Sequence, residues 1–153
     1  AFTGSFTIIC ISILISKFGE KFKNHGELCE SSVKFHLGLE YLVNPATSFD
    51  NGSDIESLNA SVKSARFSLA NSLKGESFDE QLKDYFERCH STLWIYVVTI
   101  NENVIEYHMN EKEFEEFVRS FCVLVRKSGS QDKKIRMKTM SEAKVVEWLE
   151  ARL

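Results

Sequence analysis

Two apolar runs joined by a short polar turn restrict the fold of this chain more than any other feature of its sequence. Residues 93–100 form a β-branched and aromatic run, and residues 104–109 form a second, similar run. The three residues between them are Asn-Glu-Asn, a composition typical of tight turns. We therefore predict a β-hairpin near residues 93–109.

Amphipathic segments lie on both sides of this hairpin. Their apolar residues recur every three or four positions, the spacing that places them on one face of a helix. Ser77 with Glu80 and Asn110 with Glu113 match the capping-box pattern, and Ser141 is a suitable N-cap for the last helix. The sequence predicts helices near residues 27–43, 54–73, 78–89, 111–125 and 142–153.

Two further segments favour strands. The isoleucine-rich run Phe6–Ile15 fits a buried strand, although its period alone does not separate a strand from a buried helix. About ten apolar residues are too few for a helix to cross a membrane, so no membrane span is predicted. Residues 134–139 alternate between apolar and polar side chains, which predicts a short exposed strand.

Length and composition fit one globular domain. The chain has 153 residues, of which 43% are hydrophobic and 27% charged. We expect residues 1–153 to form a single α+β domain, mostly helical, with helices packed on one face of a small antiparallel sheet. Because the chain begins at Ala1, it is either a processed form or an excised fragment of a longer protein.

Charge and cysteine usage restrict the environment and the partners. The net charge is −3, which excludes a generally cationic nucleic-acid coat protein. The four cysteines form no C-x-x-C pair and lie among apolar residues, so neither a zinc ribbon nor a redox motif is present. These features predict a reducing, intracellular location, in the cytoplasm or the nucleus.

Motifs for catalysis are scarce. The sequence has no phosphate-binding glycine loop, no G-x-S-x-G elbow and no paired histidines at metal-ligand spacing. We predict no cofactor, no metal and no catalytic residue, and an enzyme is the less favoured class. One enzymatic hypothesis stays open, in which Cys89 is a nucleophile with a histidine from elsewhere in the fold.

Surplus aromatic residues suggest a surface for a partner. Twelve phenylalanines are more than the predicted helix faces need, and four of them fall at positions that we expect to be exposed. Grouped on a surface, such side chains mark a partner site. With a free sheet edge at 134–139, they favour a non-catalytic protein–protein interaction domain, an adaptor or complex subunit whose partner is another protein or the same chain. These predicted partner-binding residues are Phe18, Phe22, Phe49 and Phe67.

A basic segment supports an alternative function. Residues 126–140 contain six basic residues and one acidic residue, whereas residues 102–116 contain six acidic residues and one lysine. A basic strand could follow a nucleic-acid backbone, although lysines on an edge strand also prevent unwanted strand pairing. The alternative is therefore a nucleic-acid-binding accessory protein whose predicted phosphate-binding residues are Lys133, Lys134, Arg136 and Lys138.

Overall fold

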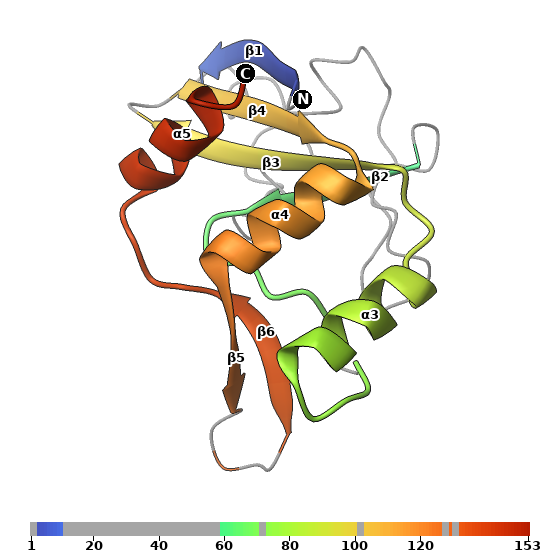
Figure 1. Cartoon of the computed structure of the whole chain (residues 1–153). Coiled ribbons are helices and arrows are strands. Elements are labelled where there is room, and N and C mark those ends of the chain that lie inside the picture. The colour runs from blue at the N-terminus through green and yellow to red at the C-terminus, as the bar shows by residue number, and fades with distance from the viewer. Residues whose placement is uncertain (1–2, 11–58, 71–72, 101–102, 127–128, 130–131) are drawn as a thin grey trace, which may run out of the picture.

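The computed structural model describes residues 3–10, 59–70, 73–100, 103–126, 129 and 132–153 (Figure 1). These residues form an α+β fold. The elements, in chain order, are β1 (Thr3–Cys10), β2 (Ala60–Ser64), α3 (Phe78–Arg88), β3 (Leu93–Ile100), β4 (Asn103–Met109), α4 (Glu111–Phe121), β5 (Cys122–Arg126), β6 (Lys133–Met137) and α5 (Glu142–Glu150).

A four-stranded sheet with the order β1-β4-β3-β2 forms the centre of the fold. β3 and β4 pair antiparallel, with Tyr96 opposite Tyr107, which confirms the predicted hairpin. β2 pairs parallel with β3, because α3 connects the two strands and returns the chain to the same end of the sheet. The sheet is therefore mixed, and the prediction of an antiparallel sheet was wrong.

The two strands β5 and β6 form a second, antiparallel sheet, which we call the ribbon. On the other side of β6, Ser68 forms a bridge with Arg136. There the Leu69 N–H donates to the Ile135 carbonyl at 3.1 Å, and the Met137 N–H donates to the Phe67 carbonyl at 2.9 Å. β6 is thus bonded along both edges.

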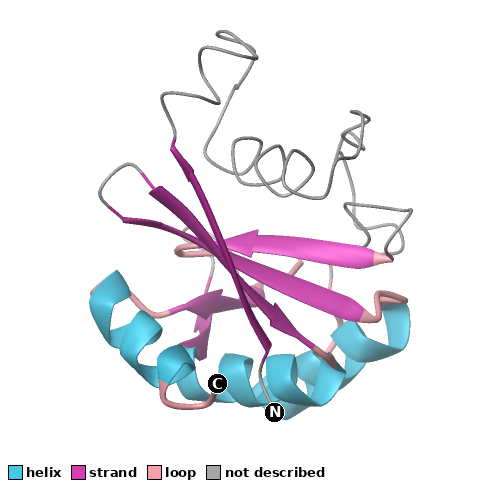
Figure 2. Cartoon of the chain, turned by 90° about the horizontal axis from the view of Figure 1, so that it is seen from above, coloured by secondary structure: helices cyan, strands magenta, loops and turns pink. Residues whose placement is uncertain are grey.

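The described helices cover one face of the four-stranded sheet (Figure 2). Phe114 and Phe117 of α4 are fully buried between this sheet and the ribbon. Phe114 stacks on Trp94 with 5.3 Å between ring centroids, and Phe117 lies 4.9 Å from Tyr96. Each such ring buries about 150–250 Å² of surface, so these contacts dominate the core.

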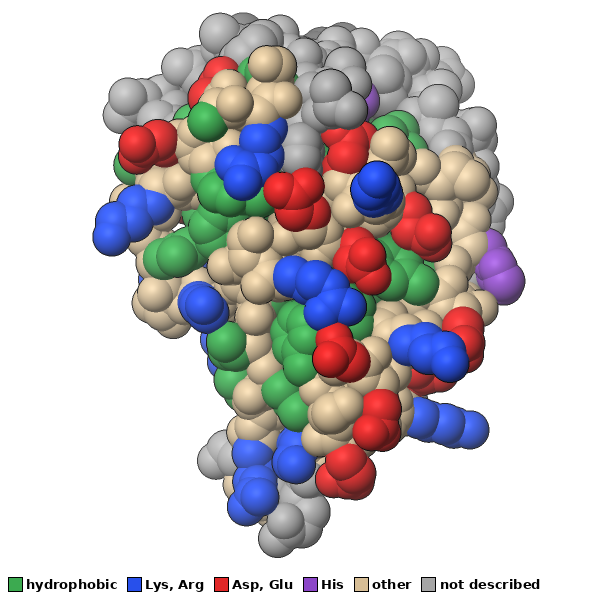
Figure 3. Space-filling view, viewed as in Figure 1, with side chains coloured by type: hydrophobic (Ala, Val, Ile, Leu, Met, Phe, Trp, Pro, Cys, Tyr) green, Lys and Arg blue, Asp and Glu red, His purple; other side chains and the backbone are tan. Residues whose placement is uncertain are grey.

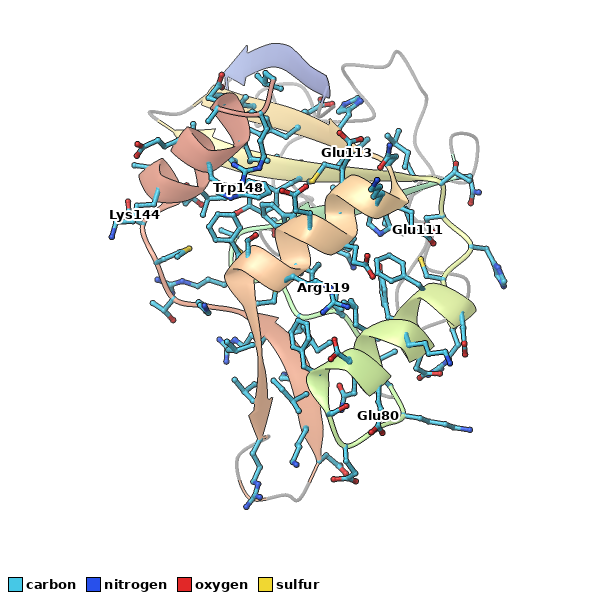
Figure 4. All side chains as sticks on the ribbon, viewed as in Figure 1. Glu80, Glu111, Glu113, Arg119, Lys144 and Trp148 are labelled. Atoms are coloured by element: carbon cyan, nitrogen blue, oxygen red, sulfur yellow. The ribbon has the colours of Figure 1, made fainter. Side chains whose placement is uncertain are left out.

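The C-terminal helix α5 is attached to the sheet and to α4. The Tyr107 hydroxyl donates to the Glu150 carboxylate at 2.6 Å. Trp148 lies toward α4 (Figure 4), where its ring is 5.2 Å from that of Phe121. Arg152 places its guanidinium 3.5 Å from the centre of the Trp148 ring and its Nε 3.2 Å from Glu116.

Sequence signals at three helix starts were accurate, except that the Glu80 side chain accepts the Glu76 N–H and so does not complete a capping box with Ser77. The Ser77 hydroxyl accepts the Glu80 N–H, and the Ser141 hydroxyl accepts the Ala143 N–H. Asn110 and Glu113 form a complete capping box, in which each side chain accepts the other residue's N–H. The strand predicted at 134–139 is present in part, as β6, which ends at Met137 and buries Ile135 and Met137 instead of being exposed.

Two helix predictions were wrong. Residues 59–70 form β2, a turn and an irregular segment, and positive φ angles at Asn59 and Arg66 are incompatible with a continuous helix. The helix expected to reach Val125 ends at Phe121, since the β-branched Cys122–Arg126 segment pairs with β6. Helices and strands therefore occupy similar numbers of described residues, and "mostly helical" was wrong.

Other predictions lie wholly or partly outside the described residues. Residues 6–10 of the predicted Phe6–Ile15 strand lie in β1, and residues 11–15 fall in the part that is not described. The helix predicted at residues 27–43 falls in the part that is not described. Among the helices that the structure describes, none is long and apolar enough to span a membrane.

Replacing the α4 cap tests the energetics of this helix. Asn110→Ala removes the acceptor for the Glu113 N–H and should lower the free energy of unfolding by about 1 kcal/mol. Asn110→Ser keeps an acceptor and should cost only a few tenths of that amount. Urea denaturation followed by circular dichroism measures both variants. Equal stability of the alanine variant and the wild type would contradict the capping assignment.

Candidate binding surface

Alternation along the ribbon divides the predicted phosphate-binding residues between its two faces. Ile135 and Met137 are buried against the core, so Lys134 and Arg136 lie on the opposite, outer face. The exposed Lys138 continues this alternation at the end of β6. Lys133 lies on the inner side, where its Nζ is 3.6 Å from a Glu76 carboxylate oxygen. The outer face therefore holds three of the four residues.

The outer face of the ribbon is not neutralised by acidic side chains. Within the described residues, none of Lys134, Arg136 and Lys138 forms an ion pair with a carboxylate. The surface over α3 and α4 is different, since positive and negative side chains alternate on it (Figure 3). There Arg119 reaches from α4 to Asp79 of α3 at 2.7 Å. In the described part of the chain, the ribbon thus carries positive charge without ion pairs, beside helices on which Lys83, Arg88 and Arg119 are paired.

The exposed edge of the ribbon is β5, and the prediction of a free edge at 134–139 was wrong. β6 is flanked by β5 on one side and by the Phe67–Leu69 segment on the other. No strand in the described part of the chain pairs with the second edge of β5. The side chain of Val123 on this strand is 36% exposed. An exposed large apolar side chain is unusual on an unpaired sheet edge.

The hydrogen-bond pattern shows which backbone groups of β5 point outward. The Lys138 N–H donates to the Phe121 carbonyl at 2.8 Å, whereas the Met137 N–H points to the other side. Because successive residues alternate, the pairs of Val123 with Arg136 and Val125 with Lys134 are the bonded ones. The N–H and C=O groups of Leu124 and Arg126 therefore point away from β6.

The predicted phenylalanine surface does not include Phe67. Its side chain is only 8% exposed, and its ring stacks on Phe117 with 6.1 Å between centroids. The residue lies in the extended segment beside β6, which directs the ring into the core, so the expectation of an exposed ring was wrong. Phe18, Phe22 and Phe49 lie outside the described residues.

The described thiols and imidazoles do not assemble into a catalytic group. Cys89 is buried and the neighbouring His90 is exposed, so the two side chains lie in different environments. His108 contacts the buried Glu106 carboxylate at 2.8 Å on the sheet face opposite the helices. No cluster of three metal-binding side chains occurs among the residues that the structure describes.

Cys122, the first residue of β5, is a poor nucleophile. Burial raises the pKa of its thiol from the ordinary value of 9.0 to about 12, and the nearby positive charge of Lys138 only partly opposes this effect. Cysteine reacts as the thiolate, so this thiol is protected at neutral pH. The same result indicates that Lys138 lies near the start of the ribbon.

Sequence reasoning missed the residues that form the open edge. Leu124 and Val125 continue the helical spacing of α4, and that spacing hid the β-branched valines at 123 and 125. Arg66, which has a φ of 61°, lies near Lys138, but nothing in the sequence indicates its position. Comparisons with protein-family models, curated proteins and solved structures found no similar protein.

The raised pKa of Cys122 predicts a pH dependence of stability. In the unfolded chain this thiol ionises near its ordinary pKa of 9.0, whereas in the folded protein it stays protonated to about pH 12. Its contribution to stability is therefore complete below pH 9 and lost as the pH rises toward 12. Urea denaturation of the wild type and Cys122→Ala across this range should show the stability advantage of the wild type shrinking. A constant difference would contradict burial of the thiol.

Proposed function

We propose that this chain is a non-catalytic protein–protein interaction domain, an adaptor or subunit of an intracellular complex. The observation that carries this proposal is the open edge of β5, where Leu124 and Arg126 direct backbone groups away from the ribbon beside the exposed Val123. An extended segment of a partner can pair with such an edge and add a strand to the sheet.

The charge of the ribbon selects an acidic partner. Lys134 and Arg136 lie one strand away from the open edge, and both side chains are long enough to reach past Val123 and Val125. A second copy of this chain pairing through β5 would bring two basic faces side by side, and the like charges would repel. The partner is therefore an extended acidic segment of another protein.

Backbone pairing alone gives only weak binding. Leu124 and Arg126 offer about four hydrogen-bonding groups, each worth about 1 kcal/mol net. That sum corresponds to a dissociation constant near 1 mM, so side-chain contacts must supply the rest. Val123 provides apolar contact area, and the cations accelerate association with an acidic segment. We expect micromolar affinity that weakens with increasing salt.

A proline at position 124 tests this mode of binding. Leu124→Pro removes an N–H that points away from β6, so the hydrogen bonds between β5 and β6 remain. The matched control is Leu124→Ala, which loses the side chain but keeps the N–H. In selections from a random-peptide display library, the wild type should enrich acidic, β-branched peptides. Leu124→Pro should bind the enriched peptides at least about tenfold more weakly than Leu124→Ala.

Two outcomes would contradict the proposal. One is that the wild type enriches no acidic peptides. The other is equal peptide binding by the proline and alanine variants when both retain the circular dichroism spectrum of the wild type, which would show that no strand is added at β5. Lys134→Gln combined with Arg136→Gln should weaken binding without changing the effect of proline.

Nucleic-acid binding is a second candidate, favoured by the shared outer face of Lys134, Arg136 and Lys138. Phosphate contacts use side chains and not the β5 edge, so Leu124→Pro should leave this binding unchanged. Three phosphate contacts with a single strand should give a slope of about −2 when log affinity is plotted against log salt concentration. Fluorescence anisotropy with a short labelled single-stranded DNA distinguishes the two candidates on the same variants.

A further inference from the structure

A hollow with a volume of about 560 Å³ lies where three distant parts of the chain meet. Its walls come from the turn after β2, the end of β6 and the first turn of α5, and Tyr96 of β3 contributes from the sheet. Cavities of about 300–1,000 Å³ are the size that binds small molecules. The lining residues are Ala65, Arg66, Tyr96, Met137, Lys138, Met140, Ser141, Glu142, Ala143 and Val145.

Several side chains that line the hollow are apolar and belong to, or pack against, the core. Met137 and Val145 are buried, and Met140 packs against the same core cluster. The Tyr96 hydroxyl lies 3.7 Å from the Met137 sulfur, so the polar atom of this ring is directed to a thioether. Methionine side chains adapt to the shape of a bound apolar group. The two methionines that line the hollow therefore suit a ligand with a flat or branched hydrocarbon group.

Two of the residues that line the hollow are cations, Arg66 and Lys138. They come from segments that lie side by side, because Ser68 bridges Arg136 and the Phe67 carbonyl accepts the Met137 N–H. Arg66 and Lys138 are both exposed, and neither forms an ion pair with a carboxylate in the described part of the chain. Two like charges held close together repel, and a bound anion would remove that repulsion.

The part of the hollow formed by α5 does not favour an anion. Glu142 of this helix lines the hollow, and its carboxylate would repel a negative group placed against α5. The Ser141 hydroxyl accepts the Ala143 N–H at 3.2 Å, so this backbone N–H of the first helical turn already has a partner and does not need an anion. The anionic group of a ligand is therefore directed to Arg66 and Lys138, with its apolar body over the methionines.

We propose that this hollow binds a small organic anion, an aromatic or branched carboxylate whose charged group contacts Arg66 and Lys138 and whose apolar body covers Met137 and Met140. The site is separate from the open edge of β5, since Leu124 does not line the hollow. Ligand binding here does not depend on the protein partner proposed above.

The methionine methyl groups report on this site directly. The chain has three methionines, and Met109, which is buried in β4 and does not line the hollow, is an internal control. In methyl NMR spectra, titration with 1-naphthoate should shift the Met137 and Met140 signals saturably and leave Met109 in place. The neutral analogue 1-naphthamide should bind at least about tenfold more weakly, because it lacks the charge.

Charge variants separate specific binding from adsorption. Lys138→Gln should weaken naphthoate binding about tenfold, whereas Lys144→Gln, at an exposed lysine of α5 (labelled in Figure 4), should leave it unchanged. Leu124→Pro should also leave it unchanged, which distinguishes this site from the strand-addition edge. The proposal is overturned by any of three results: no saturable shift at millimolar naphthoate, equal shifts of all three methionines, or equal affinity for the amide.

Discussion

The structure depends on the aromatic face of α4, which joins the four-stranded sheet to the ribbon. Phe114 and Phe117 contact Trp94 and Tyr96 on the sheet side, and Phe67 beside β6 packs against both phenylalanines. α4 then continues into β5 without a loop, as Phe121 is followed directly by Cys122. The packing of one helix therefore fixes where β5 starts, and with it the edge proposed to bind a partner.

Local signals in the sequence were sufficient for much of this fold. The hairpin of β3 and β4, the caps at Ser77, Asn110 and Ser141, and the strand β6 each follow from a few neighbouring residues. The errors fall where apolar spacing suits both a helix and a strand, as at β2 and β5. In both places the neighbouring strand determines whether the segment forms a helix or a strand. The pairing of β2 with β3 is a contact that no local pattern encodes.

The candidate surface was predictable only in part. Alternation around Ile135 was enough to group Lys134, Arg136 and Lys138, but the pairing of Lys133 with Glu76 joins residues far apart in sequence. The position of Phe67 depends on the bonds that hold its segment to β6. Arg66 and Lys138 line the same hollow for a related reason, since the segment after Arg66 is bonded to β6.

Amide hydrogen exchange followed by NMR tests the central claim most directly, which is that β5 is the open edge and β6 is enclosed. The account predicts slow exchange for the amides of Val123, Leu69 and Met137, which point into paired edges. The Leu124 amide, which points away from β6, should exchange much faster than that of Val123. Equal protection of these two neighbours, or rapid exchange at Leu69 and Met137, would contradict the account.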